Sequence, residues 1–358
     1  MRLPSVLLLI AFSCPCPAAV VSWGATNRQA RIPADMSNIV QIAPPMFLDR
    51  NGNVFGAEDQ DPRFKWAESA GALTNVAFIA TGPAHEATLK ADGTVFAWGD
   101  TEAACGFVQP DKVAVSISIG RSYMLGLTAD REILVQGENQ WATTQLPDGL
   151  THAKSVAAAT PFAAAVTLDG RVEVWGMDSW YGDIYNIGAI PMDAINVRSI
   201  HAGFGHLLAL REDETVVAWG LNDHGQCDVP AGLRNVVAVS GGWNHSLALL
   251  KNGTVVAWGG STNLAAIAIP EGLKRVKAIW AGWDVNVALT RELPRLRSDG
   301  RSLLLEGETG QSYSVECLDS DEGWRPFLTI TNLPEDGFRF EDGAPSTSRF
   351  YRALELEP

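Results

Sequence analysis

Residues 235–259 read NVVAVSGGWNHSLALLKNGTVVAWG, and this stretch decides the fold because the chain repeats it. It holds three short apolar runs, VVAVS, HSLALL and TVVAWG, separated by turn residues. Runs of this length and composition favour half-buried strands over helices. Between the second and third runs lies Asn252-Gly253, a hairpin signal in which both residues tolerate a positive φ. The stretch therefore predicts a three-stranded antiparallel unit.

The unit recurs with a period of about forty residues, and a Trp-Gly or related dipeptide closes each copy. Hairpin signals also recur, at Asn51-Gly52, Asp92-Gly93 and Asp169-Gly170. Because strands of fixed length cannot absorb unequal spacing, we expect the extra residues in loops directly after the closing dipeptides. The seven dipeptides are Trp23-Gly24, Phe55-Gly56, Trp98-Gly99, Gln136-Gly137, Trp175-Gly176, Trp219-Gly220 and Trp258-Gly259.

Both ends of the repeat array are partial units. Residues 275–290, RVKAIWAGWDVNVALT, supply two strands without a Trp-Gly strand, whereas residues 20–24 supply a Trp-Gly strand alone. If the two fragments join, they make one complete three-stranded unit, and the strand edges that each fragment would expose alone are paired. The sequence thus predicts an all-β fold, a seven-bladed β-propeller over residues 20–290 that is closed by its N-terminal strand.

The pattern GGWNHSLALLKNGTVVAWG of residues 241–259 resembles the repeat of the regulator of chromosome condensation family, also found in α-tubulin suppressor proteins and bacterial repeat proteins. The resemblance covers roughly three quarters of the chain, although the first and fourth copies lose the His. It implies guanine-nucleotide exchange on a small GTPase and partner binding through inserted hairpins or loops. The matching positions are those that build blades, so no exchange residue carries over to this chain.

The first residues have the features of a secretory signal. Residues 1–19, MRLPSVLLLIAFSCPCPAA, give a basic start, an apolar run and small residues, so we expect cleavage after Ala18 or Ala19. The apolar run is short for a membrane span. A lipoprotein processed at Cys14 and a disordered start of a cytoplasmic protein are the alternatives. The expected location is the cell envelope or the medium.

Charge and cysteine content limit the partners and the redox chemistry. Forty-one acidic and 27 basic residues give a formal charge of -14, which repels a phosphate backbone and argues against nucleic acid as a partner. Three cysteines follow the signal: Cys105, Cys227 and Cys317. Cys105 and Cys227 fall in equivalent loops of units three blades apart, too far for a disulfide. Free thiols are therefore expected.

Residues 291–358 lack the Trp-Gly rhythm and contain alternating strands such as SYSVECL and RPFLTI. They resemble the small C-terminal β-sandwich modules of exported bacterial proteins, whose frame corresponds here to Tyr313, Trp324 and residues 349–352. Surface retention and a structural cap for the propeller are two open roles for this module.

The sequence offers little for catalysis. His85, His206 and His245 share one repeat position, Gly-x-x-His, which predicts hydrogen bonds between blades rather than catalysis or metal binding. We find no nucleophile elbow, Cys-x-x-Cys pair, phosphate loop or calcium loop in the sequence. No catalytic residue, metal site or cofactor is predicted.

Two groups of aromatic residues are candidates for ligand binding, because exposed aromatic side chains favour peptide or sugar recognition. The first group holds equivalent turn positions of three consecutive units and should form an arc, unless its rings pack between blades. The second lies in loops after the closing dipeptides, unless those rings fold back on their own blades. The candidates are Phe204, Trp243 and Trp283 in the first group, and Trp141, Trp180, Tyr181 and Tyr185 in the second.

The sequence as a whole predicts an exported, monomeric, non-enzymatic binding protein without an integral membrane span. Its ligand would be a protein or a carbohydrate. A carbohydrate-active or lyase-type propeller enzyme is the alternative, because acidic residues on a propeller face can be catalytic, and an exchange-factor-like activity is implied only by the family resemblance.

Overall fold

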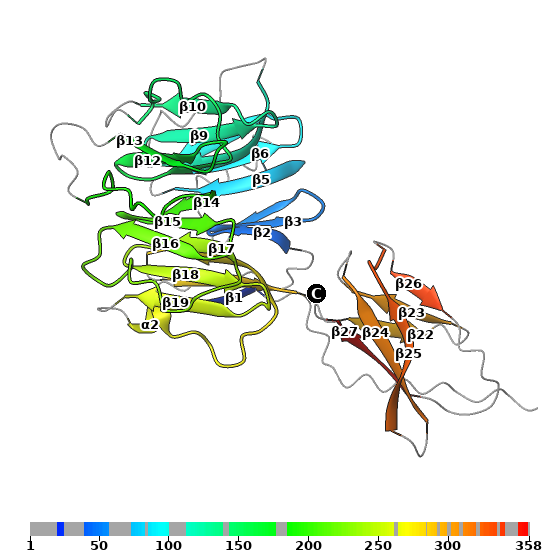
Figure 1. The fold of residues 1–358 in the computed structure, drawn as a ribbon. Helices are drawn as coiled ribbons and strands as arrows, with labels where there is room; N and C mark the ends of the chain where they lie inside the picture. The colour runs from blue at the N-terminus through cyan, green and yellow to red at the C-terminus, as the bar shows by residue number, and fades with distance from the viewer. Residues whose placement is uncertain are drawn as a thin grey trace, which may run out of the picture. The chain divides into compact units, whose positions relative to one another are not determined.

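A computed structural model of the chain describes residues 20–24, 39–56, 73–82, 85–99, 112–138, 143–176, 185–260, 264–283, 285–291, 294–298, 302–307, 311–319, 323–334, 337–340 and 350–356. The chain divides into two compact units, one spanning Val20–Thr290 and one containing Arg291–Pro358. Both consist of β-strands (Figure 1), and the described part of the chain has one short helix, α2 (Leu264–Ile267). The predicted all-β class is confirmed.

Seven three-stranded antiparallel sheets occupy the described residues of Val20–Thr290, and we number them as blades 1 to 7. The strand named second in each blade lies in the middle of its sheet. The blades are β2 (Ile39–Ala43), β3 (Met46–Asp49) and β4 (Val54–Gly56); β5 (Val76–Thr81), β6 (His85–Lys90) and β7 (Val95–Gly99); β8 (Ala114–Ile119), β9 (Tyr123–Thr128) and β10 (Ile133–Gly137); β11 (Ser155–Ala158), β12 (Phe162–Val166) and β13 (Val172–Gly176); β14 (Val197–Ala202), β15 (His206–Arg211) and β16 (Val216–Gly220); β17 (Val236–Gly241), β18 (His245–Leu250) and β19 (Val255–Gly259); and β20 (Val276–Ala281), β21 (Val285–Thr290) and β1 (Val20–Gly24).

The blades succeed one another around a ring. The first strand of each blade contacts the first strand of the next, and β2 of blade 1 also contacts β20 of blade 7. The middle strands β12, β15, β18 and β21 are buried at nearly every position, because neighbouring blades cover both faces of each sheet. Apolar side chains between adjacent blades therefore form the core of this unit.

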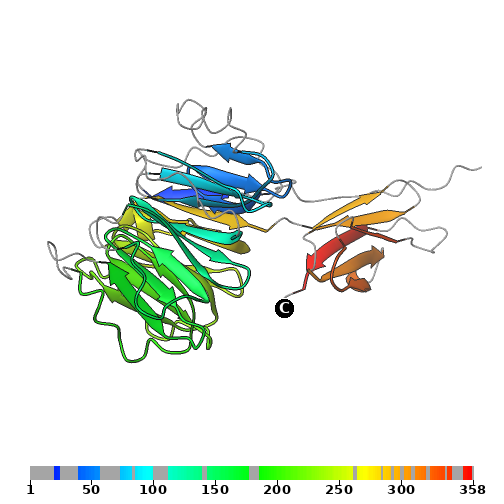
Figure 2. The same ribbon diagram turned by 90° about the horizontal axis from the view of Figure 1, so that it is seen from above.

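The N-terminal strand β1 is the outer strand of blade 7. It runs antiparallel to β21, from the pair Val20 and Leu289 to the pair Gly24 and Val285. Trp23 of β1 is buried, and its indole nitrogen donates a hydrogen bond to the Ala266 carbonyl at 3.2 Å. Figure 2 shows the blue strands from the N-terminal part of the chain beside the yellow and orange strands of the last blade.

The hairpins lie where the sequence predicts them, but their turn type differs from the prediction. In blade 6 the Gly253 amide donates to the Leu250 carbonyl and the Leu250 amide donates to the Thr254 carbonyl, so the loop has three residues. Only Gly253 has a positive φ, of 80°. Asn252 instead accepts a hydrogen bond from the Thr254 amide through its side chain, at 3.0 Å. This is a type I turn followed by a left-handed glycine.

Blade 1 departs from the repeat in a second way. Asp49 and Asn53 form the hydrogen bond that Leu250 and Thr254 form in blade 6, which aligns Phe55-Gly56 with Val256-Ala257 and not with Trp258-Gly259. The assignment of Phe55-Gly56 as a closing dipeptide was therefore wrong by two positions. Phe55 lies three residues after Gly52, whereas Trp258 lies five after Gly253. Blade 1 also has a shorter turn between its first two strands: Ala43 pairs with Met46 where Ser240 pairs with Leu247.

The unit containing Arg291–Pro358 has two three-stranded sheets in its described residues. In one of them Glu316 pairs with Arg352, whose guanidinium donates to the glutamate at 2.7 Å and lies 4.4 Å from the ring of Trp324. Glu316, Arg352 and Trp324 thus form a cross-strand cluster, and Tyr313 of the same sheet is buried. The sheets are β22 (Arg295–Ser298), β23 (Leu303–Glu306) and β26 (Phe338–Phe340), and β25 (Gly323–Ile330), β24 (Tyr313–Asp319) and β27 (Phe350–Glu355).

Candidate functional site

Strand register places the candidate residues on one face of the propeller. The middle strand begins opposite the end of the outer strand, as the pairs His206 with Gly220 and His245 with Gly259 show. The turn before each middle strand and the loop after each closing dipeptide therefore leave the blade at the same end. We call this end the loop face; the hairpin turns lie at the opposite end of each blade.

Four aromatic side chains are in contact on the loop face, and we call Tyr185, Phe204, Trp243 and Trp283 the aromatic arc. The rings of Phe204 and Trp243 stack with centroids 3.6 Å apart, and those of Trp243 and Trp283 lie 4.2 Å apart. Tyr185, from the loop after β13, meets the edge of Phe204 at 5.9 Å. The predicted arc exists, and through Tyr185 it joins the second predicted group. Trp141, Trp180 and Tyr181 lie outside the described residues.

The rings of the arc differ in exposure. Phe204 and Trp243 are nearly parallel, at 15°, so each covers a face of the other, as packing between blades requires. Trp283 is tilted by 53° to Trp243, and 53% of its surface is exposed. The packing interpretation thus accounts for the stacked pair, whereas about half of the surface of Trp283 is exposed.

Backbone hydrogen bonds fix the turns that carry the arc. The Phe204 amide donates to the Gly242 carbonyl at 3.1 Å, and the Trp243 amide donates to the Gly282 carbonyl at 3.0 Å, so each turn is attached to the next blade. A Cβ atom on Gly242 would collide with the ring of His245. The Gly-x-x-His motif is therefore a packing motif, in which the imidazole lies under a backbone that only glycine permits.

The histidines connect blades, as the sequence predicts. His245 Nε2 donates to Asn286 Oδ1 at 2.6 Å, and the Asn286 amide donates to the Ala266 carbonyl at 2.7 Å, the same carbonyl that the Trp23 indole binds. Blade 6 repeats this arrangement with His206, Ser246, the Gln226 carbonyl and Trp258. Burial, reinforced by the neighbouring His245 and His201, lowers the pKa of His206 to about 3.

Earlier blades use other side chains at this position. Tyr123 of blade 3 donates its hydroxyl hydrogen to the Phe162 carbonyl at 2.6 Å and accepts from the Ala159 amide at 3.1 Å. His85 of blade 2 bonds the Arg121 carbonyl through Nδ1 at 3.1 Å, and burial lowers its pKa to about 4. Blade 4 has Phe162 and blade 7 has Val285. Among the described residues, a side-chain hydrogen bond from this position to the next blade therefore occurs in blades 2, 3, 5 and 6.

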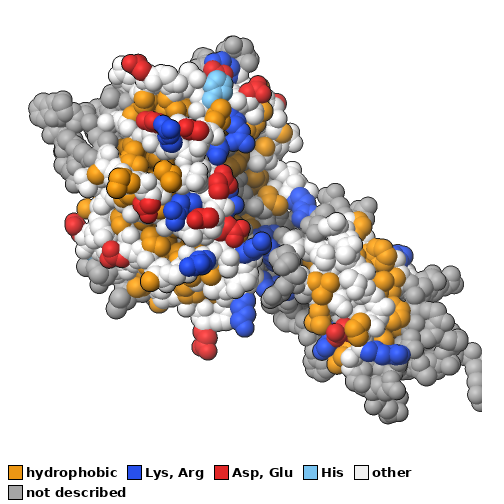
Figure 3. All heavy atoms as spheres, in the orientation of Figure 1, with side chains coloured by type: hydrophobic (Ala, Val, Ile, Leu, Met, Phe, Trp, Pro, Cys, Tyr) orange, Lys and Arg blue, Asp and Glu red, His pale blue; other side chains and the backbone are white. Residues whose placement is uncertain are grey.

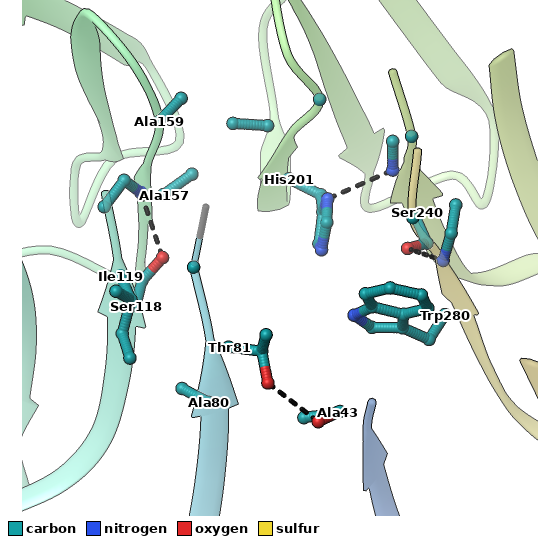
Figure 4. Close-up of a pocket in the computed structure, with 18 of the residues that line it drawn as sticks. Ala43, Ala80, Thr81, Ser118, Ile119, Ala157, Ala159, His201, Ser240 and Trp280 are labelled. Atoms are coloured by element: carbon teal, nitrogen blue, oxygen red, sulfur yellow. Dashed lines mark hydrogen bonds between the residues drawn. The ribbon is translucent and has the colours of Figure 1, made fainter. Parts of the chain in front are cut away.

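A cavity of about 450 Å³ lies between the first strands of the seven blades, and the arc residues Phe204, Trp243 and Trp283 are at its edge. One ring of equivalent side chains faces it (Figure 4). These are Ala43, Ala80, Ser118, Ala157, His201, Ser240 and Trp280, from blades 1 to 7.

Three polar members of this ring have structural bonds. Ser118 Oγ accepts from the Ala158 amide at 2.9 Å, His201 Nδ1 from the Gly241 amide at 3.1 Å, and Ser240 Oγ from the Ala281 amide at 2.9 Å. Each thereby satisfies an amide of the next blade. Sequence reasoning missed His201 and Trp280, although aligning the first strands would have shown both as departures from a small residue.

The family comparison agrees with this geometry. The family model described as "Regulator of chromosome condensation (RCC1) repeat" matches residues 197–226 and 236–263, which are most of blades 5 and 6. Blades 5 and 6 of the chain are therefore RCC1-like repeats. The resemblance inferred from residues 241–259 is confirmed.

Curated relatives share part of this RCC1-like chain. Protein pim1 of Schizosaccharomyces pombe is 29% identical over 171 residues, which are 44% of this chain and 27% of the relative. RCC1 domain-containing protein RUG3, mitochondrial, of Arabidopsis thaliana is 28% identical over 165 residues, 42% of this chain and 32% of the relative. The matches thus span less than half of the chain and about a third or less of these relatives.

Two solved structures have the same fold as the RCC1-like chain. Prp20p from Saccharomyces cerevisiae, described with its binding properties to Gsp1p and histones, superposes with a TM-score of 0.57 at 17% identity, covering 79% of this chain and 92% of Prp20p. The yeast RCC1 protein Prp20 bound to Kap60 gives a TM-score of 0.61 at 16% identity, with 79% and 90% covered. Identities this low establish the fold alone.

Other features of the RCC1-like chain bear on chemistry. No group of three or more His, Cys, Asp or Glu side chains that could hold a metal occurs among the described residues. Cys227 and Cys317 are free thiols, and burial, with the charge of Asp228, raises the pKa of Cys227 to about 12; Cys105 lies outside the described residues. Acidic and basic side chains are interspersed on the surface in Figure 3. No described helix is long and apolar enough to cross a membrane.

Proposed function

We propose that this chain is an exported, non-enzymatic binding protein that recognises a protein or a glycan with the loop face of its propeller. The observation that carries the proposal is the aromatic arc, and above all the half-exposed Trp283 at its end. An exposed tryptophan next to stacked aromatic rings is a favourable anchor for a ligand.

The arc is also held in place before any ligand arrives. Hydrogen bonds from Phe204 and Trp243 attach their turns to the following blades, and ring stacking restricts both side chains. Binding to such a surface loses little side-chain entropy, which favours affinity. The descriptions of Prp20p, a protein of the same fold, with Gsp1p, histones and Kap60 support binding as the general role of this fold.

Catalysis has less support. A carbohydrate-active or lyase-type enzyme needs carboxylates that converge on one face. None of the described residues that line the central cavity is Asp or Glu. An exchange-factor-like activity has the support of the RCC1 family alone, because no residue of this chain was matched to that activity.

Binding can be tested on a combined peptide and glycan array with the protein that starts at Val20. Trp283→Ala should weaken the strongest signal by at least about 1 kcal/mol. Met192→Ala is the matched control, because Met192 is 96% exposed and precedes β14 at the opposite end of the blade. A signal that Trp283→Ala leaves intact, or none on either array, would refute recognition by the arc.

Export requires its own test. The full chain should be produced in a bacterial host that secretes proteins, and the extracellular and periplasmic product should be sequenced from its N-terminus. The proposal predicts a start at Ala19 or Val20. A product that keeps Met1 in the cytoplasm would contradict export without affecting the proposal on binding.

A further inference from the structure

The central cavity is uncharged and asymmetric. Its lining contains no Lys, Arg, Asp or Glu among the described residues. Blades 1 to 4 contribute small side chains to its ring, such as Ala80 and Ala157, whereas blades 5 and 7 contribute His201 and Trp280. The larger side chains therefore come from the half of the propeller that also supplies the arc. We call this space, under the arc, the chamber.

His201 presents a hydrogen-bond donor to the chamber. Its Nδ1 accepts a hydrogen from the Gly241 amide, so the neutral imidazole carries its hydrogen on Nε2. Burial lowers the pKa of His201 to about 4, against a smaller opposing effect of the Ala202 carbonyl, and the ring is neutral near pH 7. Figure 4 shows the second ring nitrogen directed into the open space.

Trp280 presents a second donor. The far edge of its six-membered ring lies against the Cα of Gly282, where a Cβ would collide with it, so the opposite edge with Nε1 faces the chamber (Figure 4). In blades 3, 5 and 6 the side chain at this position accepts an amide hydrogen of the next blade. The residue that corresponds to that amide after blade 7 is Pro44, which has no amide hydrogen. Trp280 is thereby released from that structural role.

We propose that the chamber binds a terminal sugar unit of a neutral glycan, with Trp280 Nε1–H and His201 Nε2–H donating to its oxygen atoms and Trp283 stacking on the next unit. This proposal rests on the proposed function and names the ligand class. A volume of about 450 Å³ lies within the range of about 300–1,000 Å³ that small-molecule pockets occupy.

The chemistry of the chamber favours a sugar over a peptide end or an anion. A peptide amino terminus needs an acidic partner and a carboxylate or phosphate needs a cation, and the described lining has neither. The formal charge of -14 further opposes anions. Sugar hydroxyls are neutral, accept from both donors, and can donate to hydroxyl oxygens such as Thr81 Oγ1, which lines the chamber. Aromatic rings pack against the apolar faces of sugar rings.

The test is isothermal titration calorimetry of the mature chain with short neutral oligosaccharides of the gluco, manno, xylo and galacto series. Trp280→Phe keeps the ring but removes the N–H, and should weaken the bound series about 2- to 10-fold. Trp324→Phe is the matched control in the C-terminal unit and should have no effect. Ala80→Val narrows the chamber from the opposite side, keeps both donors, and should also weaken binding.

The outcomes separate this inference from the proposed function. Binding of a neutral series that both chamber variants weaken, with unchanged melting temperature, supports the chamber. Equal affinity in wild type and Trp280→Phe, or no binding of any neutral series at millimolar concentration, overturns it. If an array then still shows a peptide or charged glycan whose binding Trp283→Ala abolishes, the proposed function stands and only the sugar chamber fails.

Discussion

Blades 5 to 7 and blades 1 to 4 share one backbone plan but differ in what holds them and in what they display. In blades 5 to 7 the same chain of polar contacts recurs, from His245 through Asn286 and the Ala266 carbonyl to Trp23. Blade 3 replaces this chain by the hydroxyl of Tyr123, and blade 1 shortens its turn. The difference teaches that packing between blades tolerates several side chains. The arc and the two donors of the chamber, however, come almost entirely from blades 5 to 7.

Deletion of β1, the N-terminal strand that completes blade 7, should have the largest effect on stability. A chain that starts at Asn27 lacks β1, and with it the pairs to β21 and the buried Trp23. We expect a loss of at least about 3–5 kcal/mol in the free energy of unfolding, as for removal of a buried aromatic side chain. Thermal unfolding against the chain that starts at Val20 measures it. An unchanged midpoint would remove the account of closure by β1.

Replacement of one histidine in each half should lower the free energy of unfolding by smaller amounts, which differ between the two halves. His245→Ala leaves the buried Asn286 side chain without its histidine partner, and should cost about 2–3 kcal/mol. His85→Ala removes one bond to a backbone carbonyl and should cost about 1–2 kcal/mol. Urea denaturation of both variants provides the comparison. Equal losses of stability in the two variants would mean that the polar contacts from His245 through Asn286 to Trp23 add nothing. Stoichiometric zinc in protein purified without added metal would refute the structural role of the histidines.

Acid should destabilise the propeller through its buried histidines. The folded-state pKa is lowered to about 3 for His206 and to about 4 for His85 and His201, from 6.5. Below pH 6.5 the unfolded chain therefore binds protons that the folded chain does not, and stability falls as the pH drops from about 6.5 to about 4. The slope is at most about 1.4 kcal/mol per pH unit for each histidine.

Urea midpoints between pH 7.5 and pH 4.5 measure this slope. His206→Gln should reduce it, whereas His152→Gln, at an exposed position, is the matched control and should not. The hydrogen bond to the Thr215 side chain lowers the pKa of Asp213 below its ordinary value of 3.8, so this carboxyl affects stability chiefly below the range measured here. A flat profile across this range would contradict the burial of neutral histidines.

The smallest effect on stability is expected within the arc. Trp283→Ala removes a ring that is 53% exposed and should cost less than about 1 kcal/mol. Trp243→Ala removes a ring that contacts both Phe204 and Trp283, and should cost more. Both should weaken ligand binding. Melting curves of the two variants measure the two losses of stability. A larger loss for Trp283→Ala than for Trp243→Ala would place the Trp283 ring in the core.

How far the sequence predicts this molecule depends on the range of the interactions involved. Strands, hairpin positions and the inter-blade role of His245 follow from local pattern and repetition. The type of the Asn252-Gly253 turn does not, because the Asn252 side chain competes for the Thr254 amide. The place of Phe55 could have been found by counting from Asn51-Gly52, and an alignment of the first strands would have marked His201 and Trp280. That their ring nitrogens face the cavity depends on residues of other blades, which one sequence does not display. Tyr185 joins the arc through a tertiary contact of the same kind.

The central claim is that the ligand occupies the half of the propeller formed by blades 5 to 7, and fluorine NMR of protein labelled with 5-fluorotryptophan tests it most directly. Single Trp→Phe variants assign the signals of the 12 tryptophans. On titration with the ligand selected on the array, the signals of Trp243, Trp280 and Trp283 should shift while those of Trp98 and Trp175, in blades 2 and 4, stay in place. Shifts confined to Trp98, Trp175 or Trp324 would contradict the account.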